Sequence, residues 1–273
     1  MAMTLRRVLG RTGLDVSAIG MGTWRTFDVS GPDATAHAAD LVAEAVAAGT
    51  NFFDSSPMYG RAEKVLAGAL APRREEVVVA TKVWAKTAEE GRAQVERALA
   101  WYGGRVELYQ IHNLLAWPDH LSLLERHLEA GTVTAIGATH WNPAAFGGLE
   151  RVMRTGRITA VQVPYNPLER QVEERILPLA DELGLAVVVM RPFGEGGLTA
   201  RTPAGFDPSR YRDFEITTWA QALLKWVLSD PRCHCVIPAT SRSGRPSENA
   251  AAGGPPWFGP HEREEIAALA SAP

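Results

Sequence analysis

The run EVVVATK, residues 76–82, decides the fold class because it is apolar and rich in β-branched residues. A continuous run of this kind predicts a strand buried on both faces, as in a parallel sheet covered by helices. A helical pattern follows over about 87–102, and VELYQIH, residues 106–112, then gives the next strand-like run. The order strand, helix, strand indicates parallel pairing through a helical crossover.

The same alternation extends from this run towards both ends of the chain. The strand-like segments are 17–23, 50–55, 76–82, 106–112, 133–139, 158–165, 185–192 and 235–240. The helical patterns are 35–48, 62–70, 87–102, 118–130, 143–155, 171–183, 217–229 and 260–270. Eight such units in about 250 residues match the size of a (β/α)8 TIM barrel with right-handed crossovers.

A doubly wound open sheet is the alternative architecture. It is disfavoured because no G-x-G-x-x-G motif follows the first strand. No linker-like composition divides the chain, so we predict a single barrel domain over 1–273. In this interpretation 193–216 is an inserted loop, and the Gly- and Pro-rich stretch 244–260 is a loop over one end of the barrel.

Composition narrows the class of protein further. The chain has 46% hydrophobic and 22% charged residues and a formal net charge of −3, which gives no electrostatic case for a nucleic-acid or membrane partner. No apolar stretch approaches the ~20 residues that span a bilayer, and the N-terminus lacks the apolar core of a signal peptide. We therefore expect a cytoplasmic protein. Cys233 and Cys235 flank His234 at a spacing that suits neither a disulfide framework nor a zinc site, so no metal is expected.

Polar residues stand at the carboxyl ends of most of the predicted strands. They are Asp54, Lys82, His112, Thr139 with His140, Gln162, Arg191 and Thr240. In a barrel all these ends meet at one mouth, where the active sites of this fold lie. A single polar residue at a strand end means little, but this many in register predict a functional site.

The segment NFFDSSPMYG, residues 51–60, adds Tyr59 shortly after Asp54. Asp54 and Lys82 come from adjacent strands, so an ion pair between them is expected across the mouth. A cation beside a phenol favours phenolate, which would lower the pKa of Tyr59 from about 10 and suit it to proton transfer near neutral pH. His112 could hydrogen-bond the same oxygen. The four residues are suited to polarising a carbonyl, and Lys82 is the only strong nucleophile among them.

Together with three motifs, these residues resemble the aldo-keto reductase family, barrel enzymes that reduce carbonyls with NADPH. The family's catalytic tetrad matches Asp54, Tyr59, Lys82 and His112. The motifs are VELYQIHN (106–113), VQVPYNPL (161–168) and VIPATSRSGRPSEN (236–249), and the resemblance extends over about 9–252.

The resemblance also implies residues around NADPH. They are Gly22, Thr23, Trp24, Thr139, His140, Gln162, Arg191, Phe193, Thr240, Arg245, Glu248 and Asn249. Gln162 would bond the nicotinamide carboxamide. Thr240 and Arg245 would hold the 2′-phosphate, and Glu248 and Asn249 would face the adenine.

Three positions depart from the family pattern. Thr139-His140 replaces the usual Ser-Asn pair that holds the carboxamide, and a histidine nitrogen could take over that role. Ala239 replaces a lysine that touches the 2′-phosphate in many members, which leaves more of the discrimination to Arg245. The segment MRPFGEGGL (190–198) lacks the tyrosine that often stacks on nicotinamide, so Arg191 or Phe193 would cover that face.

Four tryptophans follow strand ends or begin the next helix: Trp24, Trp84, Trp117 and Trp141. Together they predict an aromatic pocket for an apolar substrate. The leading hypothesis is NADPH-dependent reduction of a small carbonyl substrate by a monomer or weak homo-oligomer. The alternatives are a non-catalytic NADPH sensor and a Schiff-base aldolase with Lys82 as nucleophile, which would leave Arg245, Glu248 and Asn249 without a purpose.

Overall fold

The computed structural model describes residues 4–272. The centre of the fold is a parallel sheet in which eight strands lie in sequence order. The strands are β3 (Met21–Gly22), β4 (Phe52–Asp54), β5 (Val78–Val83), β6 (Val106–His112), β7 (Val133–Thr139), β8 (Ala160–Pro164), β9 (Ala186–Met190) and β10 (Cys235–Val236). Parallel bridges join Ile19 to Val236 and Gly22 to Ala239, so the last strand returns to the first and the sheet closes as a (β/α)8 barrel. The predicted fold class is confirmed.

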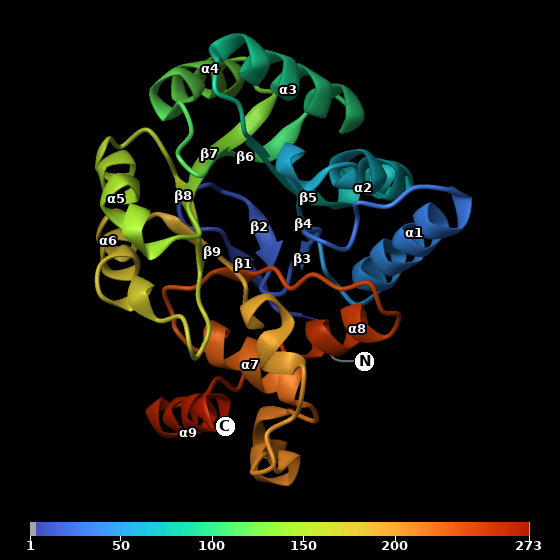
Figure 1. Cartoon of the computed structure of the whole chain (residues 1–273), viewed down its shortest axis with the longest axis vertical. Coiled ribbons are helices and arrows are strands. Elements are labelled where there is room, and N and C mark those ends of the chain that lie inside the picture. The colour runs from blue at the N-terminus through green and yellow to red at the C-terminus, as the bar shows by residue number, and fades with distance from the viewer. Residues whose placement is uncertain (1–3, 273) are drawn as a thin grey trace.

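The helices surround the ring of strands, as Figure 1 shows. They are α1 (Pro32–Ala47), α2 (Ala62–Leu70), α3 (Ala88–Trp101), α4 (Trp117–Glu129), α5 (Phe146–Arg154), α6 (Ile176–Glu182), α7 (Trp219–Leu228), α8 (Arg245–Ala251) and α9 (Pro260–Ser271). Side chains cap several of them: the Thr87 hydroxyl accepts from Glu90 N at 3.2 Å, and Thr218 forms a capping box with Gln221. Within residues 4–272 no helix combines the length and apolar character needed to cross a bilayer.

The burial of the strands explains why the sequence pattern is clear in the middle of the chain. Every residue of β5 and of β6 is buried, so both faces of these strands must be apolar or internally bonded. The outward faces pack against the helices. The inward faces form a smaller core with Phe52, Leu108 and Val188.

An N-terminal hairpin covers the end of the barrel opposite the carboxyl ends of the strands. It pairs β1 (Arg6–Val8) with β2 (Asp15–Ser17), and Leu9 and Val16 join the interior core with no exposed surface. Gly10 has a φ of 52°, and a Cβ there would lie 2.5 Å from Ala186 N. Only glycine therefore fits where the hairpin turn meets β9.

Several element boundaries differ from the sequence prediction. The expected first strand, 17–23, is divided between β2 and the two-residue β3, and the expected strand 235–240 is regular only at Cys235–Val236. Both segments are instead held by the isolated bridges that close the barrel. The prediction of a loop over 244–260 is wrong for α8, which starts after Gly244 and buries Pro246 and Ala250. The inserted segment 193–216 contains the short turns η5 (Gly194–Thr199) and η6 (Pro208–Phe214).

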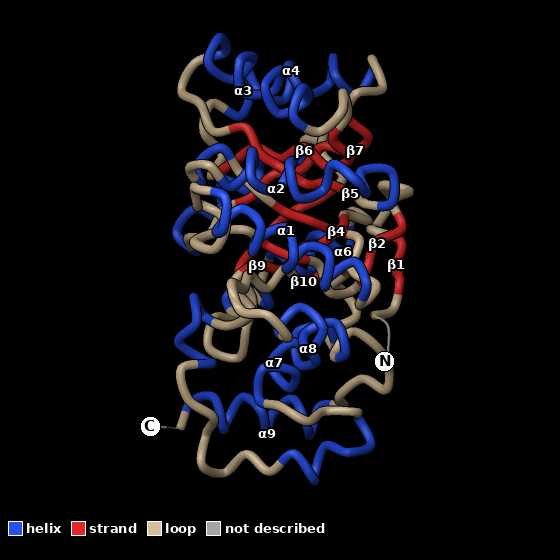
Figure 2. The backbone as a smooth tube through the Cα atoms, turned by 90° about the vertical axis from the view of Figure 1, so that its right-hand side faces the viewer, coloured by secondary structure: helices blue, strands red, loops and turns tan. Residues whose placement is uncertain are grey.

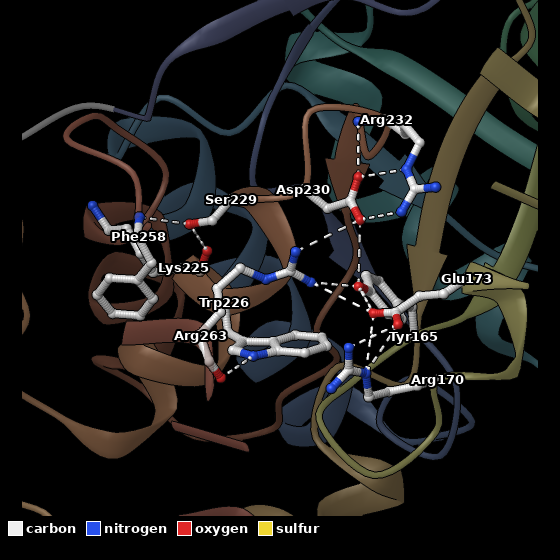
Figure 3. Close-up of polar contacts among 10 residues, drawn as sticks. All are labelled: Tyr165, Arg170, Glu173, Lys225, Trp226, Ser229, Asp230, Arg232, Phe258 and Arg263. Atoms are coloured by element: carbon white, nitrogen blue, oxygen red, sulfur yellow. Dashed lines mark hydrogen bonds and ion pairs between the residues drawn. The ribbon is translucent and has the colours of Figure 1, made fainter. Parts of the chain in front are cut away.

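A buried polar network, drawn in Figure 3, attaches α9 to the side of the barrel. Its centre is the Tyr165 hydroxyl, which donates to Glu173 and accepts from Arg263 of α9. Asp230 lies 3.4 Å from the same hydroxyl and pairs with Arg232 at 2.7 Å. The Arg263 guanidinium also lies 4.5 Å above the Trp226 ring, whose Nε1 donates to the Arg263 carbonyl at 2.8 Å. In Figure 2, α7, α8 and α9 lie together beyond the strands.

Candidate active site

The carboxyl ends of the strands surround a cavity of about 470 Å³. Of the residues predicted for the site, those that line it are Gly22, Thr23, Trp24, Asp54, Tyr59, His112, Trp141, Gln162, Arg191 and Phe193. These residues lie in β3, β4, β6 and β8 and in the segments that follow β3, β4, β7 and β9. The barrel therefore gathers at one mouth residues that are far apart in sequence.

Asp54 and Lys82 form the predicted ion pair. Lys82 Nζ lies 2.6 Å from Asp54 Oδ2 and 2.8 Å from Oδ1, and it also donates to the Ser55 carbonyl at 2.8 Å. Their side chains are at most 3% exposed. Burial raises the pKa of Asp54 and lowers that of Lys82, while their mutual attraction opposes both changes. All three donors of the ammonium group are thus engaged.

Tyr59 ends η1 (Pro57–Tyr59), a short turn that starts where β4 delivers the chain to the mouth. Ser56 caps this turn by accepting from Met58 N at 3.2 Å. The Tyr59 ring meets the His112 ring edge-on at 5.8 Å between centroids, and Lys82 Nζ lies 5.5 Å from the Tyr59 ring centroid. Within residues 4–272 the Tyr59 hydroxyl makes no hydrogen bond. It is therefore open to a ligand in the cavity.

The predicted lowering of the Tyr59 pKa is wrong for this structure. Burial raises the pKa of Tyr59, the negative charge of Asp54 adds to the rise, and Arg191 opposes it. The sequence predicted the pair of Lys82 and Asp54 but not the burial of the phenol, which is the largest cause of the rise. Tyr59 is accordingly a neutral phenol, able to donate a proton but not poised as phenolate.

His112 lies at the end of β6 and is held by Ser56, whose Oγ lies 2.7 Å from Nδ1. Burial, followed by the charges of Lys82 and His140, lowers the pKa of His112 to about 3. The imidazole is therefore neutral at physiological pH. When Ser56 donates to Nδ1, the imidazole proton resides on Nε2 and provides a hydrogen-bond donor.

Of the three residues predicted to hold the carboxamide, only Gln162 lines the cavity. Gln162 lines the cavity and accepts from Gln110 Nε2 at 2.8 Å. Thr139 is buried, and the Nδ1 of His140 accepts from Asn142 N at 3.0 Å. Neither Thr139 nor His140 lines the cavity, so a contact between them and the carboxamide stays a prediction.

Residues predicted for the adenosine end of the cofactor lie around α8, outside the cavity. Arg245 forms an ion pair with Glu248, and the second carboxylate oxygen of Glu248 accepts from Thr218 at 2.7 Å. Asn249 is 4% exposed, and its buried Oδ1 has no hydrogen-bond partner within residues 4–272. A buried acceptor without a donor costs free energy. Asn249 therefore fits a ligand that supplies an N–H group, such as the adenine amino group, and Thr240 lies beside it.

Only two of the four tryptophans predicted to form the pocket wall line the cavity. Trp24 and Trp141 line the cavity, whereas Trp84 and Trp117 do not. Trp84 is 41% exposed, with its backbone fixed by both amide atoms of Gln94. Trp117 begins α4 and packs against the outer core. Proximity to a strand end in sequence did not reveal the direction of these side chains.

Other residues that line the cavity were not predicted from the sequence. Met58, Met190 and Asn113 line the cavity next to residues that were predicted. Met190 is the last residue of β9, so its place at the mouth could have been read from the strand pattern. Arg25 and Glu195 form an ion pair at 3.6 Å between the segments after β3 and β9. That pair depends on the fold of the inserted segment, which no local pattern indicates.

Comparison with known proteins places this geometry in a family. The sequence model of the Aldo/keto reductase family matches residues 18–269. The uncharacterized oxidoreductase YrpG of Bacillus subtilis (strain 168) is 29% identical over 238 residues, covering 75% of this chain and 72% of the relative. The NADH-specific methylglyoxal reductase of Escherichia coli (strain K12) is 26% identical, covering 84% and 82%.

Solved structures share the fold. An aldo-keto reductase from Klebsiella pneumoniae in complex with NADPH superposes with a TM-score of 0.81 at 20% identity, covering 100% of this chain and 96% of that one. The holo form of an aldo-keto reductase from Bacillus halodurans gives a TM-score of 0.78 at 22% identity, covering 97% and 96%. With the family match over most of its length, this chain belongs to the aldo/keto reductase family of barrel oxidoreductases.

Proposed function

We propose that this protein reduces aldehydes and ketones to alcohols with NADPH, and that Tyr59 is the proton donor. The observation that carries the proposal is the Tyr59 hydroxyl, which has no hydrogen-bond partner within residues 4–272 although Asp54, Lys82 and His112 surround its ring. A partly buried phenol whose hydroxyl has no hydrogen-bond partner among the described residues, at the mouth of a barrel oxidoreductase, supports a role in which the substrate is that partner.

Each residue has a role in this mechanism. A nicotinamide cofactor, when bound, would supply the hydride for the carbonyl carbon. As negative charge develops on the carbonyl oxygen, the O–H bond of Tyr59 breaks and its proton passes to that oxygen. His112 is neutral, and when Ser56 donates to its Nδ1 the proton on Nε2 can orient the carbonyl by a hydrogen bond. Asp54 and Lys82 hold a fixed dipole behind the Tyr59 ring, which is preorganised and needs no rearrangement during the reaction.

The raised pKa of Tyr59 is compatible with this role. An alkoxide is a stronger base than a phenolate, so a neutral phenol can still protonate it. A high pKa also keeps Tyr59 protonated at the start of each turnover across the physiological pH range.

NADPH is proposed as the cofactor because the resemblance assigns Thr240 and Arg245 to the 2′-phosphate. The unpartnered buried acceptor of Asn249 supports binding of an adenine dinucleotide of either kind. A guanidinium is well suited to bind a phosphate. The Klebsiella neighbour is a complex with NADPH, whereas the E. coli relative is named as NADH-specific. Arg245 must exchange Glu248 for the phosphate in this proposal.

The aldolase alternative is weakened by the surroundings of Lys82. Its amine is buried and donates three hydrogen bonds, to both Asp54 oxygens and to Ser55 O. A Schiff base needs a free amine in reach of the substrate. The non-catalytic sensor differs from the proposal only in turnover. A cytoplasmic location, a single domain over 1–273 and a monomer or weak homo-oligomer stay predictions from sequence.

The test is a screen for NADPH consumption with aldehydes, ketones and sugars, combined with quenching of tryptophan fluorescence by NADPH and by NADH. The proposal expects quenching by NADPH and turnover with reactive aldehydes. Quenching without turnover on any carbonyl would support the sensor. The absence of both would refute the proposed function.

A further inference from the structure

Gln110 is a buried polar residue of β6 that the proposed mechanism does not use. It has no exposed surface and lies in register with Lys82 of β5 on one side and Gly137 of β7 on the other. Its Nε2 donates to Asp54 Oδ1 at 3.3 Å and to Gln162 Oε1 at 2.8 Å. One amide group therefore connects the buried ion pair of the site with the residue predicted to bind the nicotinamide carboxamide.

The strand beside β6 leaves room for this side chain to cross the interior of the barrel. Asp54 is in β4 and Gln162 is in β8, and each of these strands is separated from β6 by one other strand. On the side of β8 the intervening residue is Gly137. A Cβ there would lie 2.9 Å from Gln110 Cγ and 3.1 Å from the Ala160 carbonyl oxygen. A larger residue at this position would displace Gln110 from its two partners.

The charge of Asp54 determines which end of the Gln110 amide faces it. As a carboxylate paired with Lys82, Asp54 only accepts hydrogen bonds, so it attracts the Gln110 nitrogen, whose second hydrogen goes to Gln162. The Gln110 Oε1 is left without a hydrogen-bond partner within residues 4–272. A buried acceptor without a donor costs free energy, and an apolar side chain of the same length would avoid that cost. The two hydrogen bonds of the nitrogen therefore support a role for Gln110 beyond filling the core.

The orientation of Gln110 determines in turn which end of Gln162 is available to a ligand. Gln162 lines the cavity, and because its Oε1 accepts from Gln110, its Nε2 is the end left for a ligand. Burial raises the pKa of Asp54, and hydrogen bonds from both glutamines oppose that rise after the attraction of Lys82. A primary amide nitrogen carries two hydrogens, so Gln162 can donate to Asp54 and still offer an N–H to the cavity.

Resting on the proposed reduction with NADPH, we propose that Gln110 is a positioning residue, which fixes the Gln162 amide so that an N–H faces the nicotinamide carboxamide. The group that Gln162 recognises is then the carboxamide oxygen, because a carboxamide has no other acceptor. The orientation originates at the Asp54–Lys82 ion pair and reaches Gln162 through Gln110. One side chain thus links the ion pair beside Tyr59 to the site of the cofactor.

The test is a double-mutant cycle on cofactor affinity, measured by tryptophan fluorescence with NADP⁺ and with its acetylpyridine analogue, which carries a methyl group in place of the amide nitrogen. Gln110→Met keeps the length of the side chain and removes both hydrogen bonds. It should weaken the binding of NADP⁺ and of the analogue by the same factor, about 3- to 10-fold, because both carry the carbonyl oxygen. In the Gln162→Met background the same substitution should change either Kd by less than about twofold, since the residue through which Gln110 acts is gone.

Leu108→Met is the matched control for repacking of the barrel interior. Leu108 lies two residues before Gln110 on the same face of β6, has no exposed surface and also approaches Gly137. Its substitution should leave both affinities within about twofold of the wild type. Gln110→Asn is a second variant of the positioning residue, because it keeps the amide but is one methylene too short to reach both partners. It should weaken both cofactors as Gln110→Met does.

An effect of Gln110→Met that persists undiminished in the Gln162→Met background would show a general structural role and overturn the proposal. So would an equal loss of affinity in Leu108→Met, or no loss in either Gln110 variant. A loss confined to NADP⁺ would also overturn it, because Gln162 would then contact the carboxamide nitrogen. A wild type that binds no nicotinamide cofactor would contradict the proposed function and this inference together. One that binds NADP⁺ but reduces no carbonyl would contradict the proposed function alone.

Discussion

Two tyrosines of this protein, Tyr59 and Tyr165, both lie among acidic and basic side chains, but their hydroxyl groups are bonded differently. In both, burial raises the pKa. The Tyr165 hydroxyl donates to Glu173 and accepts from Arg263, so its bonding capacity is used within the protein. The Tyr59 hydroxyl makes no hydrogen bond within residues 4–272. A raised pKa therefore does not separate a reactive tyrosine from a structural one, whereas the state of its hydroxyl does.

The charged side chains around the two hydroxyls also differ in the groups with which they pair. Beside Tyr59, Lys82 and Asp54 are paired with each other and leave the phenol alone. Beside Tyr165, Glu173 and Arg263 bond the phenol itself and thereby fix α9 (Figure 3). The first arrangement keeps a donor available for a substrate. The second uses the same kinds of residue to join two elements.

The largest effect that we expect comes from removing the free hydroxyl. Tyr59→Phe should lower kcat by about 10²- to 10⁴-fold, the usual contribution of general acid catalysis, while the Kd of NADPH is unchanged. Steady-state kinetics and fluorescence titration at fixed pH measure both quantities. Tyr165→Phe is the matched control and should keep kcat within about threefold. If the Tyr59 variant kept more than about a third of wild-type kcat, Tyr59 would not be the donor.

Breaking the buried ion pair should have the next largest effect. Asp54→Asn leaves the Lys82 ammonium buried without a counter-charge, which should lower the free energy of unfolding by about 3–5 kcal/mol. Asp230→Asn should cost less, because its partner Arg232 is 27% exposed and can reach water. Urea denaturation of both variants gives the comparison. Equal losses would mean that burial of the cation does not determine the cost.

The exposure of a cation should also matter for Arg245, which is predicted to bind the cofactor. Arg245 is 43% exposed and, among the described residues, pairs only with Glu248, so it can exchange that partner for a phosphate. Arg245→Ala should weaken NADPH binding by about 10- to 100-fold and leave NADH binding unchanged. Arg242→Ala, in the same exposed segment, is the control for loss of charge. A wild type that binds NADH as tightly as NADPH would show the assignment of Arg245 to be wrong.

Removing the hydroxyl of Tyr165, which is hydrogen-bonded within the protein, should have a smaller effect on stability. Tyr165→Phe removes a donor to Glu173 and an acceptor for Arg263, so the free energy of unfolding should fall by about 1–3 kcal/mol. The loss should be visible in denaturant titration. A fall in kcat of more than tenfold, with cofactor affinity intact, would show that this network also positions the mouth.

The smallest expected effect concerns pH. Because the pKa of His112 is lowered to about 3, the imidazole stays neutral and kcat/KM should show no inflection near pH 6.5. The unfolded chain binds the proton first, since its histidine titrates near 6.5. The contribution of His112 to stability is therefore complete above about pH 6.5 and is lost as the pH falls towards 3. An activity inflection near 6.5 that disappears in His112→Gln would contradict a neutral imidazole.

The sequence predicted the barrel because strands buried on both faces leave a continuous apolar pattern, as in β5 and β6. It predicted β3 and β10 poorly, since these strands are regular for only two residues each and the barrel closes through isolated bridges. It missed α8 because glycine and proline flank that helix, and such residues also occur in loops.

Strand ends predicted that Asp54, His112 and Gln162 would meet at one cavity, and the segment after β4 added Tyr59. The direction of side chains after a strand is decided by loop conformation, so Trp84 and Trp117 were placed wrongly in the wall. The pKa of Tyr59 was predicted in the wrong direction because the sequence does not show how far the fold removes the phenol from water, which is the largest cause of the rise.

The closure of the sheet by Gly22 and Ala239 has a consequence for the order in which the protein is made. During translation β3 is the first strand of the barrel to leave the ribosome, whereas the residues that cover its open edge are among the last of the barrel to be synthesised. Until then β3 and the most recently formed strand present unpaired edges, which are sites of wrong pairing between nascent chains. We therefore expect wrong pairing at these two edges to compete with productive folding until the C-terminal segment emerges.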